Sequence, residues 1–279
     1  MNVRIIIDST ADMPRQSKER FTVVPMSILF GDEEFVDGVS IDHRTFYEKL
    51  IESDVLPTTS QPSPDAFAKA FEDAKQKGES AVVLTVSSRL SGTYQSACIA
   101  AQDYENVYVV DSKSVAIGTG ILAQLALDMA DEGADAQTIA KTLEAERDNV
   151  RLVAMLDTLE YLKKGGRISK TVAFAGGLLS IKPVVCIDDG EIQILGKARG
   201  SKQGNNLLVK EIEKAGGVNF DKPLMLGYTG LSELLLKKYI ADSASLWEGN
   251  TSRLPATPIG SVVGTHAGPG AVAVAFFKN

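Results

Sequence analysis

Cysteine and histidine are scarce in this sequence. Its 279 residues include only two cysteines, Cys98 and Cys186, and only two histidines, His43 and His266. Two cysteines are too few for a disulfide framework or for a metal site built on cysteine. Neither histidine has a second histidine or cysteine at the spacing of a metal-binding motif. We therefore expect no metal ion.

Long apolar segments are also missing. The longest apolar stretch, residues 117–130, is interrupted by Gln124 and Asp128, so it is a poor candidate for a transmembrane helix. The amino-terminal apolar run ends at Asp8 and is too short for a signal peptide. We expect a cytoplasmic protein without a transmembrane segment, for which only transient contact with a membrane is possible.

An excess of positive charge is absent as well. The formal net charge is −7, from 29 Lys and Arg against 36 Asp and Glu. Such a chain is not suited to general nucleic-acid binding, which needs a basic surface. The rest of the composition, 44% hydrophobic and 23% charged, is typical of a globular protein. The length suits one large domain or two modest ones.

The first half of the chain alternates short apolar runs with helical patterns. The apolar runs are rich in β-branched residues and indicate buried parallel strands. Ser63 followed by Pro64 is typical of a helix start. This alternation predicts a Rossmann-like parallel sheet with flanking helices. Strands are expected at residues 3–8, 21–30, 81–86 and 107–111, and helices around residues 46–51, 67–74 and 94–101.

The second half mixes hairpins with helices. Residues 182–188 and 190–199 are predicted as two strands joined by a turn at residues 188–190. The pattern predicts an α/β domain with a mixed sheet. Its other expected elements are a strand at 151–156, helices at 205–215 and 231–239, a strand at 224–229, and a strand–loop–strand segment at 259–277.

We therefore predict two α/β domains. The first is an N-terminal domain of residues 1–155, and the second is a C-terminal domain of residues 156–279. The loop near residues 56–80 belongs to the first domain in sequence but can pack against the second.

Residues 56–64, LPTTSQPSP, combine hydroxyl side chains with prolines. Proline restricts the backbone, which predicts a stiff loop in front of a helix start. Hydroxyl groups donate hydrogen bonds to a carboxylate or phosphate without carrying a charge. They also serve as caps and turns. The residues alone leave both an anion site and a plain helix entry open.

Residues 86–96, VSSRLSGTYQS, follow a predicted buried strand and open a helix. In open α/β sheets, ligands lie at the carboxyl ends of the strands. The free N–H groups at a helix start favour an anion. Ser91 and Gly92 would lie at this place, and Gly92 would allow close backbone approach. The alternative is that Ser91 only caps the helix.

Gly118, Gly120 and Ala123 form a loose G-x-G-x-x-A pattern. The dinucleotide fingerprint requires a strand that ends directly before the first glycine. The predicted strand ends near Asp111, too far upstream. We therefore interpret these small residues as positions of close helix packing.

Three further residues have open roles. Arg167, within the basic segment 163–170, could bind an anion bidentately or lie in a solvated loop. His43 falls in the first turn of a predicted helix, where we expect a surface position. His266 lies among glycines before an apolar run and reads as a loop residue.

Several of these segments stand in the order found in one family. The sequence resembles the DegV family of bacterial fatty-acid-binding proteins over nearly its whole length. Seven short motifs in the family's order argue against chance. The motifs are DSTAD (8–12), TSQPS (59–63), LSGTYQSA (90–97), VVDS (109–112), LEYLKKGGRIS (159–169), IKP (181–183) and GTHAGPGA (264–271).

The resemblance implies that one long-chain fatty acid is buried between or beside two domains. Thr59 and Ser91, next to Gly92, match the family's threonine and serine that hold the carboxylate. Arg167 and His266 match positions near the head group. The fatty-acid-kinase partners in this family present the carboxylate to a separate ATP-dependent kinase, which forms an acyl phosphate for phospholipid synthesis. Our candidate to face such a kinase is Arg199.

The energetics of a lipid ligand agree with such a site. Burial of one CH₂ is worth about 0.8 kcal/mol. A chain of roughly 15 methylenes could contribute on the order of 12 kcal/mol before ordering costs. The tail would supply most of the affinity, and the head-group contacts would fix which end faces out.

An enzyme is the alternative. An acyl hydrolase or transferase would use Ser91 as nucleophile and His266 as base. Arg89 and Thr93 stand where the G-x-S-x-G elbow needs glycines, which counts against it. The expected function is a lipid carrier without catalytic residues, with the fatty acid as its only bound group.

Overall fold

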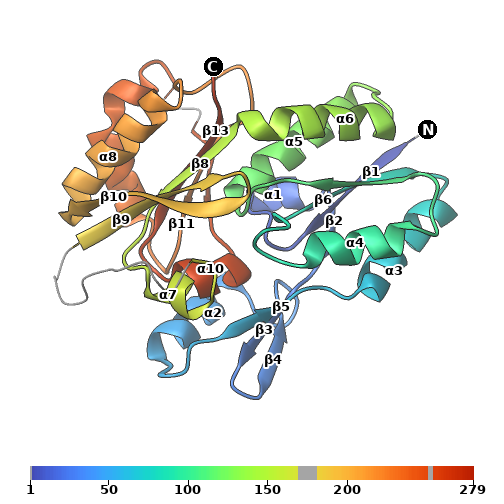
Figure 1. Cartoon of the computed structure of the whole chain (residues 1–279), viewed down its shortest axis with the longest axis horizontal. Helices are drawn as coiled ribbons and strands as arrows, with labels where there is room; N and C mark the ends of the chain where they lie inside the picture. The colour runs from blue at the N-terminus through green and yellow to red at the C-terminus, as the bar shows by residue number, and fades with distance from the viewer. Residues whose placement is uncertain (1, 169–180, 251–253) are drawn as a thin grey trace.

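The computed structural model describes residues 2–168, 181–250 and 254–279. The described chain forms a parallel four-stranded sheet, a mixed six-stranded sheet and a small three-stranded sheet (Figure 1). The first two sheets lie beside each other, and the third lies below them in Figure 1. The predicted α/β class is confirmed.

The parallel sheet has the order β2-β1-β6-β7. Helices α3 (Pro64–Gln76) and α4 (Thr93–Ala101) pack on one face. Helices α5 (Ile117–Asp131) and α6 (Ala136–Glu146) pack on the other. The strands are β1 (Val3–Asp8), β2 (Thr22–Val24), β6 (Ser80–Thr85) and β7 (Val107–Asp111).

Burial on both faces explains why these strands read as unbroken apolar runs. In β1, Ile5 and Ile7 pack toward α5 and α6. Ile6, between them, packs toward α3 and α4. All three side chains are buried. The sequence signal of a parallel sheet therefore reflects two separate cores.

The six-stranded sheet has the order β10-β9-β8-β13-β11-β12 and mixes parallel with antiparallel pairs. Helices α8 (Gly200–Lys214) and α9 (Leu234–Asp242) pack on one of its faces. This confirms the predicted mixed sheet. The strands are β8 (Val150–Met155), β9 (Ile181–Asp188), β10 (Glu191–Arg199), β11 (Met225–Tyr228), β12 (Ala256–Pro258) and β13 (Val272–Phe277).

The two-domain division stays a prediction. Strand β8 pairs with β9 and β13, so it belongs to the second sheet. A border drawn by sheet membership therefore falls before Val150 and not after residue 155. In the segment 56–80, helix α3 packs on the first sheet, whereas β5 (Thr58–Ser60) contacts α10 (Ser261–Ala267).

The predicted strand region over residues 21–30 is divided between two sheets. The segment forms β2 in the parallel sheet and then β3 (Ser27–Phe30), which pairs with β4 (Glu33–Val36) and β5 in the third sheet. Pro25 lies between the two strands. It has no N–H to donate to a ladder, and its ring fixes φ, so the chain leaves the first sheet there.

The predicted strand–loop–strand at residues 259–277 was wrong in its first part. The segment begins with helix α10 and ends with strand β13. Val262 and Val263 form a short β-branched run, which the sequence pattern cannot assign to helix or strand. Gly264 lets this helix approach α2 (His43–Glu52), because a Cβ there would overlap the Phe46 and Tyr47 rings.

Smaller differences concern helix faces and ends. In α2, Phe46, Tyr47 and Leu50 are buried, whereas Ile51 is 56% exposed. His43 is half-buried against the Tyr47 ring at 4.8 Å between centroids, not at the surface as predicted. The predicted helices at 205–215 and 231–239 run from 200 to 214 and from 234 to 242.

Two local predictions are confirmed. The Ser63 hydroxyl accepts a hydrogen bond from the Ala66 N–H and caps α3, with Pro64 in its first turn. Gly118 and Gly120 are close-packing positions in α5. A Cβ on Gly118 would overlap Ser114, and one on Gly120 would overlap the Asp12 carbonyl.

Candidate ligand-binding site

An apolar cavity lies between the parallel sheet and the six-stranded sheet. The loops that follow β1, β6 and β7 border it on one side, and β8, β9, β10 and β13 border it on the other. The space between its atoms is about 900 Å³, its open mouth included. The apolar lining includes Leu152, Ala154, Leu156, Val185, Ala271 and Ala273. We call this space the lipid-type cavity.

Small side chains keep this cavity open over the sheet. Ala271, just before β13, and Ala273 within it line the cavity, whereas Val272 and Val274 pack in the core under α8 and α9. Ala273 pairs with Ala154 on the neighbouring strand. Two adjacent methyl groups therefore leave room that larger side chains would fill. The alternation in residues 271–274, AVAV, follows from this: the alanines face the cavity and the valines face the core.

Thr59 and His266 meet at the polar end of the cavity. Thr59 lies on β5 and His266 in the last turn of α10, and their Oγ1 and Nε2 atoms are 3.0 Å apart. Burial, together with the nearby charge of Arg167, lowers the pKa of His266 to about 4. The ring is therefore neutral at neutral pH.

Which tautomer the neutral His266 ring adopts decides whether the Thr59 hydroxyl is free to donate to a ligand. If Nε2 carries the proton, it donates to Thr59 Oγ1, and the threonine hydroxyl hydrogen is free to point into the cavity. His266 Nδ1 is buried and has no hydrogen-bond partner among the described residues. A carboxylate placed at Thr59 would accept the threonine hydrogen, which favours the Nε2–H tautomer.

Ser91 lies at the start of α4, on the same cavity. Its Oγ is 2.8 Å from Thr93 Oγ1, and Thr93 is fully buried. If Thr93 donates to Ser91, the serine hydrogen is left for a ligand. Gly92, not Ser91, is the N-cap residue of α4, although the Thr93 N–H donates to Ser91 Oγ at 3.4 Å. Sequence reasoning missed the supporting role of Thr93.

Gly92 does not face the cavity, although we predicted that its backbone would approach a ligand closely. It does not line the cavity, and the Gln61 side chain occupies the space that a Cβ on Gly92 would need. Gln61 Nε2 donates to the Gly92 carbonyl at 3.3 Å and to Ser96 Oγ at 2.9 Å. The glutamine thus ties the loop that carries Thr59 to the helix start that carries Ser91.

Arg167 reaches the cavity from the turn after α7 (Glu160–Lys164). Its Nε donates to the Leu90 carbonyl at 3.2 Å and its Nη1 to the Gly165 carbonyl at 2.6 Å. These bonds leave further guanidinium N–H groups for a ligand. The last two residues of the predicted basic segment 163–170 lie outside the described residues.

Arg199 lies away from this group. It ends β10, is exposed, and does not line the cavity. Its backbone N–H donates to Gln203 Oε1 at 3.1 Å, at the start of α8. The structure therefore brings together Thr59, Ser91, Arg167 and His266, but not Gly92 or Arg199.

Asp8, the first residue of DSTAD, orders two loops of the cavity. Its carboxylate accepts the Thr10 N–H at 2.9 Å and the Val86 N–H at 2.7 Å. Thr10 and Val86 both line the cavity. Asp8 is fully buried, and burial raises its pKa. The carboxylate therefore joins the ends of β1 and β6 below the ligand space.

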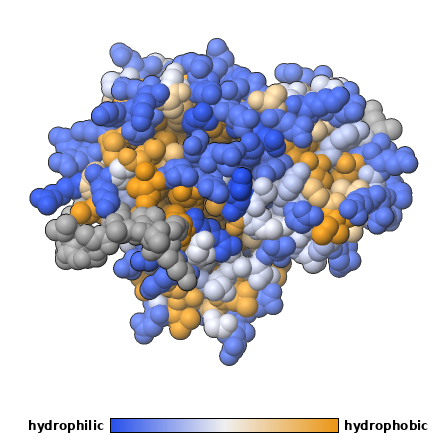
Figure 2. Space-filling view, in the orientation of Figure 1, coloured by the Kyte–Doolittle hydropathy of each residue, from blue (hydrophilic) through white to orange (hydrophobic). Residues whose placement is uncertain are grey.

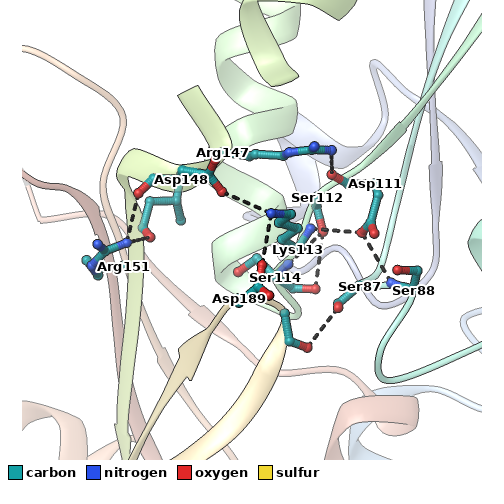
Figure 3. Close-up of polar contacts among 12 residues, drawn as sticks. Ser87, Ser88, Asp111, Ser112, Lys113, Ser114, Arg147, Asp148, Arg151 and Asp189 are labelled. Atoms are coloured by element: carbon teal, nitrogen blue, oxygen red, sulfur yellow. Dashed lines mark hydrogen bonds and ion pairs between the residues drawn. The ribbon is translucent and has the colours of Figure 1, made fainter. Parts of the chain in front are cut away.

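A polar network holds the β9–β10 turn against the parallel sheet (Figure 3). Lys113 Nζ donates to Asp189 Oδ1 at 2.9 Å, and Ser87 Oγ donates to the Gly190 carbonyl at 2.8 Å. Lys113 and Asp189 have φ values of 48° and 43°. Because Ile187 and Ile192 of this hairpin line the cavity, the network fixes one of its walls.

The outer side of the same hairpin is apolar. Figure 2 shows apolar side chains gathered at the surface over β9 and β10. Ile194 of β10 packs with Val185 on the cavity side, whereas Leu195 packs with the core under α8 and α9.

The contacts of a serine hydrolase are not formed. His266 Nε2 lies against Thr59, while Ser91 lies against Thr93. No carboxylate orients His266 Nδ1 among the described residues, as a catalytic triad would require. A histidine with a pKa of about 4 is also a weak base near neutral pH.

Metal and membrane features complete the description. In residues 2–168, 181–250 and 254–279, no three His, Cys, Asp or Glu side chains are grouped to hold a metal ion. None of the helices in these ranges has an apolar stretch long enough to cross a bilayer. Cys98 and Cys186 are both free thiols, and burial raises the pKa of Cys186 to about 11.

These features define a class: an α/β protein whose two larger sheets enclose an apolar cavity with hydroxyl and imidazole groups at one end. The family model described as "Uncharacterised protein, DegV family" matches residues 2–279, and the chain belongs to this family. A DegV domain-containing protein of Caldanaerobacter subterraneus is 33% identical over 278 residues, which cover 98% of each chain.

Solved structures agree with the family assignment. A fatty-acid-binding DegV family protein from Thermus thermophilus has a TM-score of 0.86 and 29% identity, with 100% of both chains covered. A DegV family protein from Eubacterium eligens, loaded with heptadecanoic acid, has a TM-score of 0.85 and 26% identity over 99% of this chain and 100% of that one. Relatives of this chain therefore bind fatty acids in crystals.

Proposed function

We propose that this chain binds one long-chain fatty acid in the lipid-type cavity and acts as a carrier, not as an enzyme. The observation that carries the proposal is the combination of an apolar space lined by small residues with four polar groups at one end. The fatty acids in structures of related proteins support it. The apolar part would take the tail and the polar end the carboxylate.

The polar end suits a carboxylate held without a lysine. Thr59 and Ser91 would each donate a hydroxyl hydrogen, and Arg167 would add charge from the side. Each hydrogen bond to a charged group contributes about 1.5–3 kcal/mol. Burial of a dozen or more methylenes contributes several-fold more. Affinity would come mainly from the tail, and orientation from the head group.

A carrier of this kind can hand its ligand to an enzyme. We propose that an ATP-dependent fatty acid kinase phosphorylates the presented carboxylate, and that the acyl phosphate enters phospholipid synthesis. The resemblance to the family supports this partner. Arg199 is exposed at the end of β10, so it is accessible to a docking protein and is our candidate contact.

Ligand identity and head-group contacts can be tested together. Protein purified from cells should release fatty acid that mass spectrometry detects. The double variant Thr59→Ala with Ser91→Ala should bind fatty acid at least about tenfold more weakly, because two charge-assisted hydrogen bonds are lost. The matched control is Thr138→Ala with Ser201→Ala, which removes two hydroxyls that do not line the cavity. Wild-type affinity in the test variant would refute the head-group assignment.

The kinase proposal needs a separate experiment. Arg199→Glu should reduce acyl phosphate formation by a fatty acid kinase and leave lipid binding unchanged. Arg15→Glu makes the same charge change on α1, where the side chain is 94% exposed, and should change neither property. Loss of lipid binding in Arg199→Glu would instead show a structural role for this arginine.

A further inference from the structure

A second cavity, lined by both charged and apolar side chains, adjoins the lipid-type cavity. It is bordered by α1 (Arg15–Lys18), by the loop after β4 and by the start of α10, and it opens to solvent. The space between its atoms is about 1620 Å³, its open mouth included. We call it the outer pocket. The proposed carrier function makes no use of it.

The wall between the two cavities is one residue thick. At four places, consecutive residues line different cavities, the first facing the outer pocket and the second the lipid-type cavity. The pairs are Ser9 with Thr10, Pro25 with Met26, Pro258 with Ile259, and Ser261 with Val262.

Buried carboxyl groups give the outer pocket an excess of negative charge. Asp12 and Asp37 line it and are only 3% and 8% exposed. Asp8 lies close enough to raise the pKa of Asp12. Lys18 is the cation whose charge acts on all three carboxyl groups, and its Nζ donates to the Ser9 carbonyl at 3.1 Å. One ammonium therefore balances three carboxylates when all are ionised.

Asp12 is the carboxyl group whose partners are incomplete. Its Oδ1 accepts the Gly260 N–H at 2.9 Å, at the start of α10. Its Oδ2 is buried and has no hydrogen-bond partner among the described residues. Asp37, by contrast, is bonded by the Ser9 and Ser261 hydroxyls. A buried carboxylate oxygen without a donor is costly when the group is ionised, so Asp12 must either take up a proton or gain a donor at this atom.

We propose that the outer pocket is a second ligand site, which takes a small molecule with a primary ammonium group bound at Asp12. An ionised carboxylate only accepts hydrogen bonds, and an ammonium only donates them. The charge excess favours a cation over a neutral donor. No three-ligand metal site exists among the described residues, which favours an organic cation. Phe21 and Val23 offer apolar walls for its carbon stem.

The protonation of Asp12 supports this geometry. Its pKa is raised to about 7, mainly by burial and also by the charges of Asp37 and Asp8, while Lys18 and the Gly260 N–H oppose the rise. Without a ligand, a proton neutralises this carboxyl near neutral pH. An ammonium would have to displace that proton. Binding should therefore be tighter at pH 8 than at pH 6, with proton release on binding.

Calorimetric titration of the intact protein with n-butylammonium chloride at pH 8 tests the site. We expect the ammonium to bind, and n-butanol and potassium chloride not to bind. Asp12→Asn keeps an acceptor for Gly260 but removes the charge, so affinity should fall at least about tenfold. Glu19→Gln, on the exposed rim of the same pocket, makes the same charge change and should stay within about twofold.

A measurement on the wild-type protein makes the test independent of how Asp12→Asn folds. Titrations in buffers of different ionisation enthalpy at pH 7 should show release of about half a proton per ammonium bound. No binding at millimolar ammonium would mean that ordered water alone satisfies Asp12. Equal binding of butanol or potassium, or equal affinity at pH 6 and pH 8, would also overturn the proposal. Fatty acid binding is measured separately, so failure of one site leaves the other testable.

Discussion

The two larger sheets contribute to the lipid-type cavity in different ways. The parallel sheet contributes the ends of its strands, where loops carry Thr10 and Ser91. The six-stranded sheet contributes a face, on which Ala154 and Ala273 lie side by side. Loops at strand ends can place polar groups because their backbone is not committed to a ladder. A sheet face provides a smooth apolar surface whose depth is set by side-chain size.

Under the proposed function, the loop that carries Ser91 would orient the ligand together with β5, α10 and the turn after α7, and the face of the six-stranded sheet would supply affinity. Substitutions near the polar end should change the geometry of the polar groups. Substitutions on the cavity face of the six-stranded sheet should change the length of acyl chain that fits. The four predictions below follow this division, from the largest expected effect to the smallest.

The largest effect concerns the pH dependence of stability from His266. Its pKa is lowered in the folded state to about 4, against an ordinary value of about 6.5. The unfolded chain therefore binds a proton first as pH falls, and stability is lost between about pH 6.5 and pH 4. The loss is on the order of 3 kcal/mol in the ligand-free protein.

Chemical denaturation of wild-type and His266→Gln protein across this pH range measures the contribution. The difference between their free energies of unfolding should shrink as pH falls. A difference that is constant from pH 7 to pH 4 would show that His266 is not buried as a neutral ring.

The next effect concerns the sheet face. Ala273→Leu adds three carbons where the tail would lie, so about three methylenes of ligand are displaced. The expected cost is about 2.4 kcal/mol, or roughly a 50-fold weaker affinity for hexadecanoic acid. Ala241→Leu, the same change at an exposed position of α9, is the control. Unchanged affinity in Ala273→Leu would place the tail elsewhere.

A smaller effect concerns the tie between the two polar loops. Gln61→Ala removes the hydrogen bonds to the Gly92 carbonyl and Ser96 but touches no cavity atom. We expect about fivefold weaker fatty acid binding from about 1 kcal/mol of lost positioning. The affinity for hexadecanol, which has no carboxylate, should change less. An equal loss for both ligands would indicate a general loosening of the fold.

The smallest effect concerns the network at the hairpin turn. Lys113→Met breaks the ion pair with Asp189, whose side chain is 70% exposed. Exposed ion pairs contribute about 0–1 kcal/mol, so thermal unfolding should shift only slightly. Lys77→Met, at an exposed helical pair with Asp73, is the matched control. If Lys113→Met lowers the free energy of unfolding by several kcal/mol and Lys77→Met does not, this contact holds the two sheets together.

Much of the fold could be predicted from the sequence because local patterns determined it. The parallel strands carry unbroken apolar runs, and the hairpin turn at residues 188–190 has residues suited to it. The helix α10 was missed because Val262 and Val263 are β-branched and the helix is short. Its helical form depends on tertiary packing of Gly264 against α2, which no local pattern records.

The candidate site could be predicted only in part. Thr59, Ser91, Arg167 and His266 stand in short motifs, and the fold places all four on one cavity. Gln61 and Thr93 lie inside the same motifs, but their roles depend on contacts between loops. The hydrogen bond that Asp12 does form comes from the Gly260 N–H, 248 residues further along the chain. Pairings of this kind follow from the fold and not from sequence spacing.

The central claim is that the polar end holds a fatty acid carboxylate. Carbon-13 NMR of hexadecanoic acid labelled at C1 tests it directly, because the label reports the surroundings of the carboxyl carbon alone. We predict a single resonance for the bound carboxyl carbon, at the chemical shift of an ionised carboxylate at neutral pH. This resonance should shift in Thr59→Ala, in Ser91→Ala and in their double variant. A bound resonance identical in wild type and double variant would contradict the account.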